Sequence, residues 1–282
     1  MTTIIANAEL NMNAFDLSGA FDYLFSDLTS TAAIYYDDAN NYQAFTGFDL
    51  AYNASGDWIG GTITGAVTVE GGVTVYQYSD FSILAVTLYP LILANDFQAL
   101  FDTILAGNDT ITGSAFKDVI GGNDGDDIIH GNSGNDVIFG GSGVDSLFGG
   151  DFNDRLYGNG GADLLDGQNG LDTLMGGGGQ DAFQFSTKLK SKNLDTIIDF
   201  SVADDTINLS SAIFTKAGAI GELNPWRFVI GNSAQDSLDR IIYDSGSGEL
   251  FYDSDGDGFN PAIQFAQLST GLALTSADFQ IV

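Results

Sequence analysis

Nine aspartates recur every nine residues through the middle of the chain. When nine-residue units are counted from Ile104, the sixth position is aspartate in every unit up to residue 184. These residues are Asp109, Asp118, Asp127, Asp136, Asp145, Asp154, Asp163, Asp172 and Asp181. Carboxylates and the backbone carbonyls of exposed glycine-rich turns are the oxygen ligands that a hard divalent cation takes. The spacing therefore predicts a series of cation sites.

The eighth position of every unit is a large apolar residue, so the repeat also encodes a core. These residues are Ile111, Ile120, Ile129, Ile138, Leu147, Leu156, Leu165, Leu174 and Phe183. A short strand is not stable alone, so each such side chain must stack on copies from neighbouring units. Burial of each is worth roughly 1.5–3 kcal/mol. The elements that position the aspartates are therefore short stacked strands.

The units resemble the RTX nonapeptide, G-G-x-G-x-D-x-U-x, a calcium-binding repeat. The clearest copies here are GNDGDDIIH, GNSGNDVIF and GNGGADLLD. The resemblance implies an all-β fold, a right-handed parallel β-roll in which two units complete one coil. It also implies that the first six residues of a unit form a turn, the last three form a strand, and each calcium ion lies between successive turns on one edge.

Electrostatics supports a cation independently of the resemblance. Adjacent coils lie about 4.8 Å apart, and carboxylates at that spacing repel by roughly 3 kcal/mol per pair at an effective dielectric of about 20. Several such pairs would exceed the stability of an ordinary domain. Ca²⁺ fits better than Mg²⁺ because it accepts 6–8 oxygens in flexible geometry. We therefore expect several Ca²⁺ ions and a roll that does not form without them.

By the geometry of the resembled family, the sites form two rows. The fourth position is glycine throughout the first row, at Gly107, Gly125, Gly143, Gly161 and Gly179. In the second row Phe116 and Phe152 replace two of the four glycines, and Lys117 adds a positive charge. We expect four well-formed sites on the first row and weaker or missing sites on the second. The additional acids Asp124, Asp126, Asp151 and Asp166 fall outside the repeat, and we expect them on the solvated surface.

Residues 185–282 resemble the segment that closes the roll in secreted serralysin-type proteins. The pattern D-x-I-x-D-F is matched by Asp195 and Asp199, and Asp195 is a further candidate calcium ligand. The terminal LTSADFQIV resembles the uncleaved signal of type I secretion substrates through Asp278, Phe279, Ile281 and Val282. The alternative is an ordinary terminal strand, and the two are compatible.

Two hairpins are predicted in the same region, in RIIYDSGSGELFYD and FYDSDGDGFNPAIQFAQL. The loop from Asp253 to Gln264 has acids at the first, third and fifth positions of an EF-hand loop but glutamine at the twelfth. A plain hairpin turn is favoured over a further calcium loop.

Residues 1–103 carry little chemical signal. Segments around 41–53, 57–70 and 72–86 read as strands, and residues 96–105 read as a short helix leading into the first repeat. We expect a small β-rich module that caps the first coil. Its aromatics, including Tyr35, Tyr42 and Trp58, favour core packing over a sugar-binding face.

Composition excludes several classes of function. The 282 residues contain no cysteine and one histidine, His130, so thiolate zinc sites, cysteine nucleophiles and two-histidine metal sites cannot be built. The net charge of −30 argues against nucleic acid and anionic membranes as partners. There is no G-x-S-x-G or H-E-x-x-H motif. No stretch is long enough for a spanning helix, and the N-terminus does not read as a cleaved signal.

These observations predict three regions: a capping module at 1–103, a β-roll at 104–184 and a C-terminal cap at 185–282. They predict a non-catalytic, secreted calcium-binding protein, exported by type I secretion machinery, that folds when it meets extracellular calcium. Two alternatives remain open. One is an extracellular adhesin that binds cell-surface glycan through the N-terminal module, and the other is an enzyme with an unrecognised active site in residues 1–103.

Overall fold

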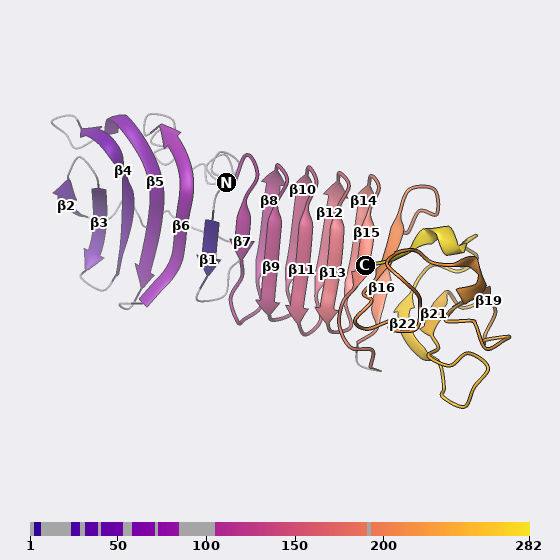
Figure 1. Cartoon of the computed structure of the whole chain (residues 1–282). Helices are drawn as coiled ribbons and strands as arrows, with labels where there is room; N and C mark the ends of the chain where they lie inside the picture. The colour runs from indigo at the N-terminus through magenta and orange to yellow at the C-terminus, as the bar shows by residue number, and fades with distance from the viewer. Residues whose placement is uncertain are drawn as a thin grey trace.

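The computed structural model describes residues 105–190 and 193–282 in full, and the backbone of six strands nearer the N-terminus. Nearly all of its elements are β-strands, and the middle of the chain is a parallel β-roll (Figure 1). No helix in the described part of the chain has the length and apolar character needed to cross a membrane.

The roll is built from strands that alternate between two sheets. Its strands are β7 (Thr110–Thr112), β8 (Val119–Asp124), β9 (Ile128–Ser133), β10 (Val137–Ser142), β11 (Ser146–Asp151), β12 (Arg155–Gly160), β13 (Leu164–Asn169), β14 (Thr173–Gly178), β15 (Ala182–Phe185) and β16 (Asp195–Ile197). Odd-numbered strands pair in one sheet and even-numbered strands in the other. Parallel pairing joins Ile111 to Ile129 and Ile120 to Ile138, so one coil takes 18 residues, as the repeat predicts.

The strands are longer than the three residues that the resemblance implies. Strand β10, for example, runs from Val137 to Ser142, so it includes the first three positions of the following unit. The first of these positions, Gly140, is buried and lies beside the carboxylate of Asp145. Because glycine has no side chain, the Asp145 carboxylate fits beside Gly140 inside the roll. The strand can therefore keep its backbone pairing for three residues past the end of the unit.

The core lies between the two sheets and is formed by the eighth position of each unit. All nine of these side chains, from Ile111 to Phe183, are 0% exposed. The core continues through Ile197 and Ile207 into the C-terminal region, where Phe185, Phe214 and Phe265 pack edge to face. Stacking of the inward side chains therefore unites the roll with its C-terminal cap.

The N-terminal strands form an antiparallel sheet that joins the roll. They are β1 (Thr3–Ala6), β2 (Leu24–Leu28), β3 (Ala32–Asp38), β4 (Asn41–Tyr52), β5 (Trp58–Glu70) and β6 (Val73–Leu84). Strand β1 pairs antiparallel with β6 and parallel with β7, so the first roll strand is hydrogen-bonded to this sheet. The helix expected at 96–105 and the side chains of the N-terminal aromatics lie almost entirely outside the described residues.

The C-terminal region extends both sheets of the roll. Its elements are β17 (Thr206–Leu209), β18 (Gly221–Glu222), η3 (Pro225–Arg227), β19 (Phe228–Ile230), β20 (Ile241–Asp244), β21 (Glu249–Tyr252), β22 (Ile263–Gln267), η4 (Ser276–Asp278) and β23 (Phe279–Ile281). Strand β17 pairs with β15 and β23, and β16 pairs with β14 and β22. The antiparallel pairs β20–β21 and β21–β22 confirm the two predicted hairpins.

Candidate metal centre

The repeated aspartates form two ladders, one on each edge of the roll. We call Asp109, Asp127, Asp145, Asp163 and Asp181 the first row, and Asp118, Asp136, Asp154 and Asp172 the second row. In both rows Oδ1 of every aspartate after the first accepts a hydrogen bond from the backbone N–H of the aspartate one coil earlier, at 2.7–3.0 Å within the repeat block. One carboxylate oxygen is thereby fixed in seven of the nine turns.

The other carboxylate oxygen points into the roll and lacks a partner in most rungs. The side chains of Asp127, Asp136, Asp145, Asp154, Asp163, Asp172 and Asp181 are 1–2% exposed, and Oδ2 of each has no hydrogen-bond donor. A buried carboxylate oxygen without a donor is costly unless a proton or a cation meets it. These seven atoms are the strongest indication of a metal in the described part of the chain.

Backbone carbonyl oxygens converge on the same places. A Cβ added to Gly131 would lie 2.6 Å from Asp136 Oδ2 and 2.5 Å from the carbonyl oxygen of Gly149, one coil later. The same pairing of Oδ2 with a carbonyl recurs at Gly122, Gly140, Gly149 and Gly158. No three acidic or histidine side chains come together among the described residues, so a cage here must draw on main-chain oxygens. Mixed carboxylate and carbonyl ligation suits Ca²⁺.

The fourth-position glycines of the first row are needed for the turns. All five have left-handed backbone, with φ between 110° and 148°. At Gly161 an added Cβ would collide with the carbonyl oxygen of Gly143, and the same contact recurs from Gly143 to Gly125. Glycine therefore both permits the left-handed turn and lets successive turns approach closely.

The two phenylalanines of the second row behave differently from each other. Phe152 adopts the left-handed φ of 83° that glycine would take, and its carbonyl oxygen lies against Gly170 as in the glycine turns. Phe116 is not left-handed, although its carbonyl oxygen lies against Gly134 in the same way. The turn before it is closed by Ser114, whose N–H and hydroxyl donate to the Asp118 carboxylate at 2.6–3.1 Å. Among the second-row aspartates, Asp118 is therefore the one whose carboxylate is occupied by donors of its own turn. Weaker or missing sites across the whole second row stay a prediction.

Burial raises the pKa of the ladder carboxyls in the absence of metal. Desolvation raises the pKa of Asp127 to about 7 and that of Asp154 to about 8, although a backbone N–H partly offsets the shift in each. Neighbouring aspartates add repulsion that raises the pKa further. The first-row carboxyls of Asp163 and Asp181 rise to about 6 for the same reasons. The metal-free ladder thus resists ionisation, and a divalent cation would relieve that resistance.

Asp195 continues the second row beyond the repeats. It is 2% exposed, and its Oδ1 accepts the N–H of Asp172 at 3.2 Å. Asp195 follows Asp172 by 23 residues and not by the 18 of the repeats, yet it takes the next place in the ladder. Asp172 and Asp195 interact across a short distance, and burial raises the pKa of both.

Asp205 continues the first row in the same way, and the repeat pattern did not reveal it. Its Oδ1 accepts the N–H of Asp181 at 3.0 Å. Asp199 lies nearby and accepts from the N–H groups of Gly176 and Gly177 at 3.0 and 2.9 Å. The available signal was DDTINL, in which Asp205 stands two residues before an apolar position, as in the repeat.

The expectation of a solvated surface is wrong for one of the four additional acids. Asp124, Asp126 and Asp151 are exposed, but Asp166 is 1% exposed. Its carboxylate accepts from Gln184 Nε2 at 3.0 Å and from the N–H of Gln168 at 3.1 Å. Asp166 is tolerated inside because its oxygens are satisfied, which nothing in the repeat position indicates.

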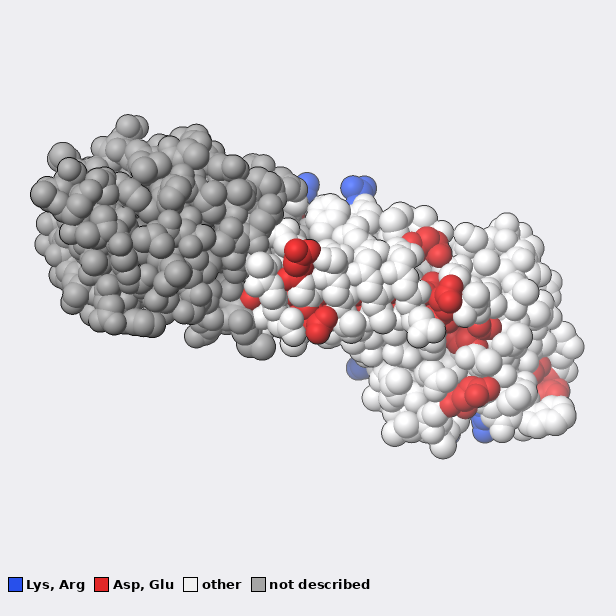
Figure 2. All heavy atoms as spheres, turned by 90° about the horizontal axis from the view of Figure 1, so that it is seen from above, with Lys and Arg blue, Asp and Glu red and all other residues white. Residues whose placement is uncertain are grey.

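Residues outside the ladders have other partners. His130 stacks on Phe148, with ring centroids 4.8 Å apart. In the loop between β21 and β22, Asp253 Oδ1 accepts from the N–H groups of Asp255 and Gly256 at 3.1 and 2.9 Å. On the described part of the surface, acidic side chains form separate patches (Figure 2). The ladder carboxylates lie inside the roll.

Comparisons with known proteins agree with this geometry. Residues 105–138, 113–147, 121–156 and 148–183 match the RTX calcium-binding nonapeptide repeat in four overlapping copies. The middle of the chain therefore consists of RTX calcium-binding repeats. The search of curated proteins gave no match.

Two solved structures are similar to the chain at low identity. One is the AlgE6R3 subunit from the Azotobacter vinelandii mannuronan C5-epimerase, with 18% identity, a TM-score of 0.23, and coverage of 62% of this chain and 78% of that one. The other is the extracellular lipase LipA from Serratia marcescens, with 16% identity, a TM-score of 0.24, and coverage of 62% and 38%.

Proposed function

We propose that this protein is a secreted, non-catalytic calcium-binding protein whose roll folds when Ca²⁺ enters the two aspartate rows. The observation that carries the proposal is the set of seven buried Oδ2 atoms without donors, each set in a glycine-rich turn. The ligands are the sixth-position aspartates, continued by Asp195, together with carbonyl oxygens of the turns. The bound ion supplies positive charge and turn-to-turn bridging, and the chain supplies the oxygens and the stacked core.

Calcium concentration would then act as a folding switch. In a low-calcium cytosol, repulsion between carboxylates keeps the repeats open, which suits export of an unfolded chain. At the roughly 10⁻⁴–10⁻³ M affinities of extracellular modules, calcium outside the cell stabilises the folded state by linkage.

The terminal segment supports export before folding. Phe279 and Ile281 are 0% and 1% exposed, because β23 is hydrogen-bonded to β17 inside the sheet. If residues 278–282 carry a type I secretion signal, the machinery must read it while this strand is free. An unfolded state in low calcium meets that requirement.

The experiment is a calcium titration of the chelated chain, followed by far-UV circular dichroism. We expect β-structure to rise cooperatively with calcium. Asp127→Asn should shift the midpoint to higher calcium, because a buried ligand charge is lost. Asp124→Asn should leave the midpoint nearly unchanged, because Asp124 is exposed and Asn retains its acceptor for the Ser142 hydroxyl. Equal β-structure with and without calcium would refute the proposal.

A further inference from the structure

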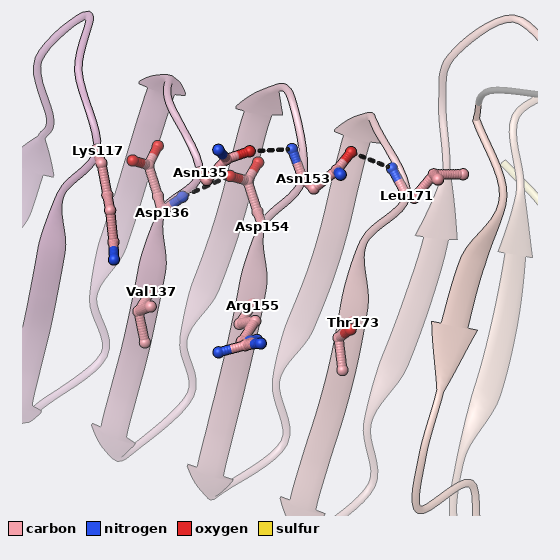
Figure 3. A pocket seen from close by; sticks show the side chains of 9 residues that line it. All are labelled: Lys117, Asn135, Asp136, Val137, Asn153, Asp154, Arg155, Leu171 and Thr173. Atoms are coloured by element: carbon pink, nitrogen blue, oxygen red, sulfur yellow. Dashed lines mark hydrogen bonds between the residues drawn. The ribbon is translucent and has the colours of Figure 1, made fainter.

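The outer face of the even-numbered sheet has a hollow of about 450 Å³ beside the second row. Its lining comes from three successive coils and the turn before them, and comprises Lys117, Asn135, Asp136, Val137, Asn153, Asp154, Arg155, Leu171 and Thr173 (Figure 3). Lys117 and Arg155 are the two basic residues of the block 104–184, which otherwise carries acidic charge. Both basic residues of the roll thus meet in one hollow.

The two cations are available to a ligand. Both side chains are exposed, and neither has a hydrogen-bond or ion-pair partner among the described residues. Asp136 and Asp154 also line the hollow, but their carboxylates are 1% exposed and belong to the ladder. The charge offered to solvent inside the hollow is therefore positive.

The asparagines of the hollow present donors as well. Asn135 Oδ1 accepts the N–H of Asn153 at 3.1 Å, and Asn153 Oδ1 accepts the N–H of Leu171 at 3.0 Å. A backbone N–H can only donate, so the bonded atom of each side chain must be its oxygen. The Nδ2 groups of Asn135 and Asn153 remain free, one coil or roughly 4.8 Å apart.

We propose that this hollow binds an acidic oligosaccharide, with Lys117 and Arg155 pairing with its carboxylate groups and the two asparagine amides donating to its oxygens. Among the side chains, donors predominate, so an acceptor-rich anion fits. An extended peptide would bring N–H groups that find few acceptors here. The lining of the hollow contains no aromatic side chain on which a nucleic acid base could stack.

Calcium loading offsets the charge of the roll around the hollow, although the chain as a whole stays negative. The block 104–184 has a net charge of −11, and about six divalent ions would offset it. The inference rests on the proposed function only in that the roll must be folded and calcium-loaded. The binding measurements therefore follow a check by circular dichroism that the roll has folded, which separates failure of this inference from failure of the calcium proposal.

The test is isothermal titration of the folded full-length chain with an oligogalacturonate, with both in the same calcium buffer. Because the oligogalacturonate itself binds Ca²⁺, the heat of its titration into that buffer alone is subtracted. The comparison ligands are a neutral oligosaccharide of equal length, a polyglutamate peptide and a single-stranded oligonucleotide. We expect binding of the oligogalacturonate that weakens with salt, and much weaker binding of the other three. Absence of binding, or equal binding of any comparison ligand, would overturn the proposal.

Three variants locate the site. Lys117→Ala with Arg155→Ala should weaken binding at least about tenfold. Lys188→Ala with Lys190→Ala removes the same charge outside the hollow, and should change the affinity less than about twofold. Asn153→Asp keeps the acceptor for Leu171 but replaces a donor with negative charge, so it should weaken binding by a roll that circular dichroism shows to be folded. Equal effects of the two double variants, or unchanged binding by Asn153→Asp, would place the ligand elsewhere.

Discussion

At the scale of single residues, the turns combine two demands, left-handed backbone and close approach. Phe152 meets the first with a φ of 83° while its side chain is 63% exposed. A left-handed backbone costs a non-glycine residue about 1–2 kcal/mol, and little packing offsets that cost here. Phe116 occupies the equivalent position with 59% exposure, but it is not left-handed. The two residues therefore form a matched pair.

Phe152→Gly should raise the free energy of unfolding in calcium by up to about 1 kcal/mol, because relief of strain exceeds the added entropy of the unfolded chain. Phe116→Gly should lower it by about 0.5–1 kcal/mol, because no strain is relieved. Chemical denaturation of both variants in excess calcium measures the two changes. Shifts of the same sign in both would contradict this account of the turns.

At the scale of elements, roll strands such as β12 contain a position that faces the aspartate ladder, where there is room for glycine but not for a side chain. In β12, Gly158 faces the ladder, and an added Cβ would lie 2.5 Å from the carbonyl oxygen of Gly176 and closer still to Asp163 Oδ2. Gly160, in the same strand, would bring a Cβ no nearer than 3.9 Å to the carbonyl oxygen of Gly141. One strand thus contains an essential glycine and a replaceable one.

Gly158→Ala should destabilise the calcium-loaded protein by about 1–3 kcal/mol and lower its calcium affinity, because the methyl group displaces ligand oxygens. Gly160→Ala should be neutral or slightly stabilising, because alanine restricts the unfolded chain without a clash. Thermal melts across a calcium series measure both effects. If the two variants melt alike at every calcium concentration, the proposed position of the oxygen cage is wrong.

At the scale of the whole molecule, the fold could be predicted from the repeat because one period controls both the aspartate ladder and the apolar core. Asp109 to Asp181 and Ile111 to Phe183 follow that period without exception. The departures could not be predicted, because they depend on packing outside it. Asp166 is buried by partners at Gln184 and Gln168, and Asp205 rejoins a ladder only after an insertion that the period does not describe.

The second position of the unit carries a conformational signal that the glycine of the repeat consensus does not make evident. Its backbone is left-handed in seven units, at Asn123, Asn132, Gly141, Gly150, Asn159, Gln168 and Gly177. Asparagine and glycine are the residues that tolerate this conformation, and they fill six of the seven positions. In the unit that begins at Gly113, the second position is Ser114. The hydroxyl of Ser114 donates hydrogen bonds to the Asp118 carboxylate and so closes the turn.

The response of the whole molecule to pH should reverse sign when calcium is removed. In the metal-free protein, burial raises the pKa of Asp127 to about 7, Asp136 to about 6 and Asp154 to about 8, whereas an exposed aspartate titrates near 3.8. Protonated ladders are therefore stable below about pH 4, and that stability is lost as the pH rises through 6 to 8. In calcium the ligands must be ionised, so stability should instead fall as the pH is lowered.

Melting curves from pH 4 to pH 8, recorded in chelator and in millimolar calcium, measure both branches. The chelated protein should be most folded at the acidic end, where protons replace the cation as the group that meets Oδ2. The loaded protein should be most stable near neutral pH, and the two curves should converge at the acidic end, where calcium no longer binds. If the chelated protein instead gained stability on going from pH 5 to pH 8, the buried carboxylates would not be what prevents folding without metal.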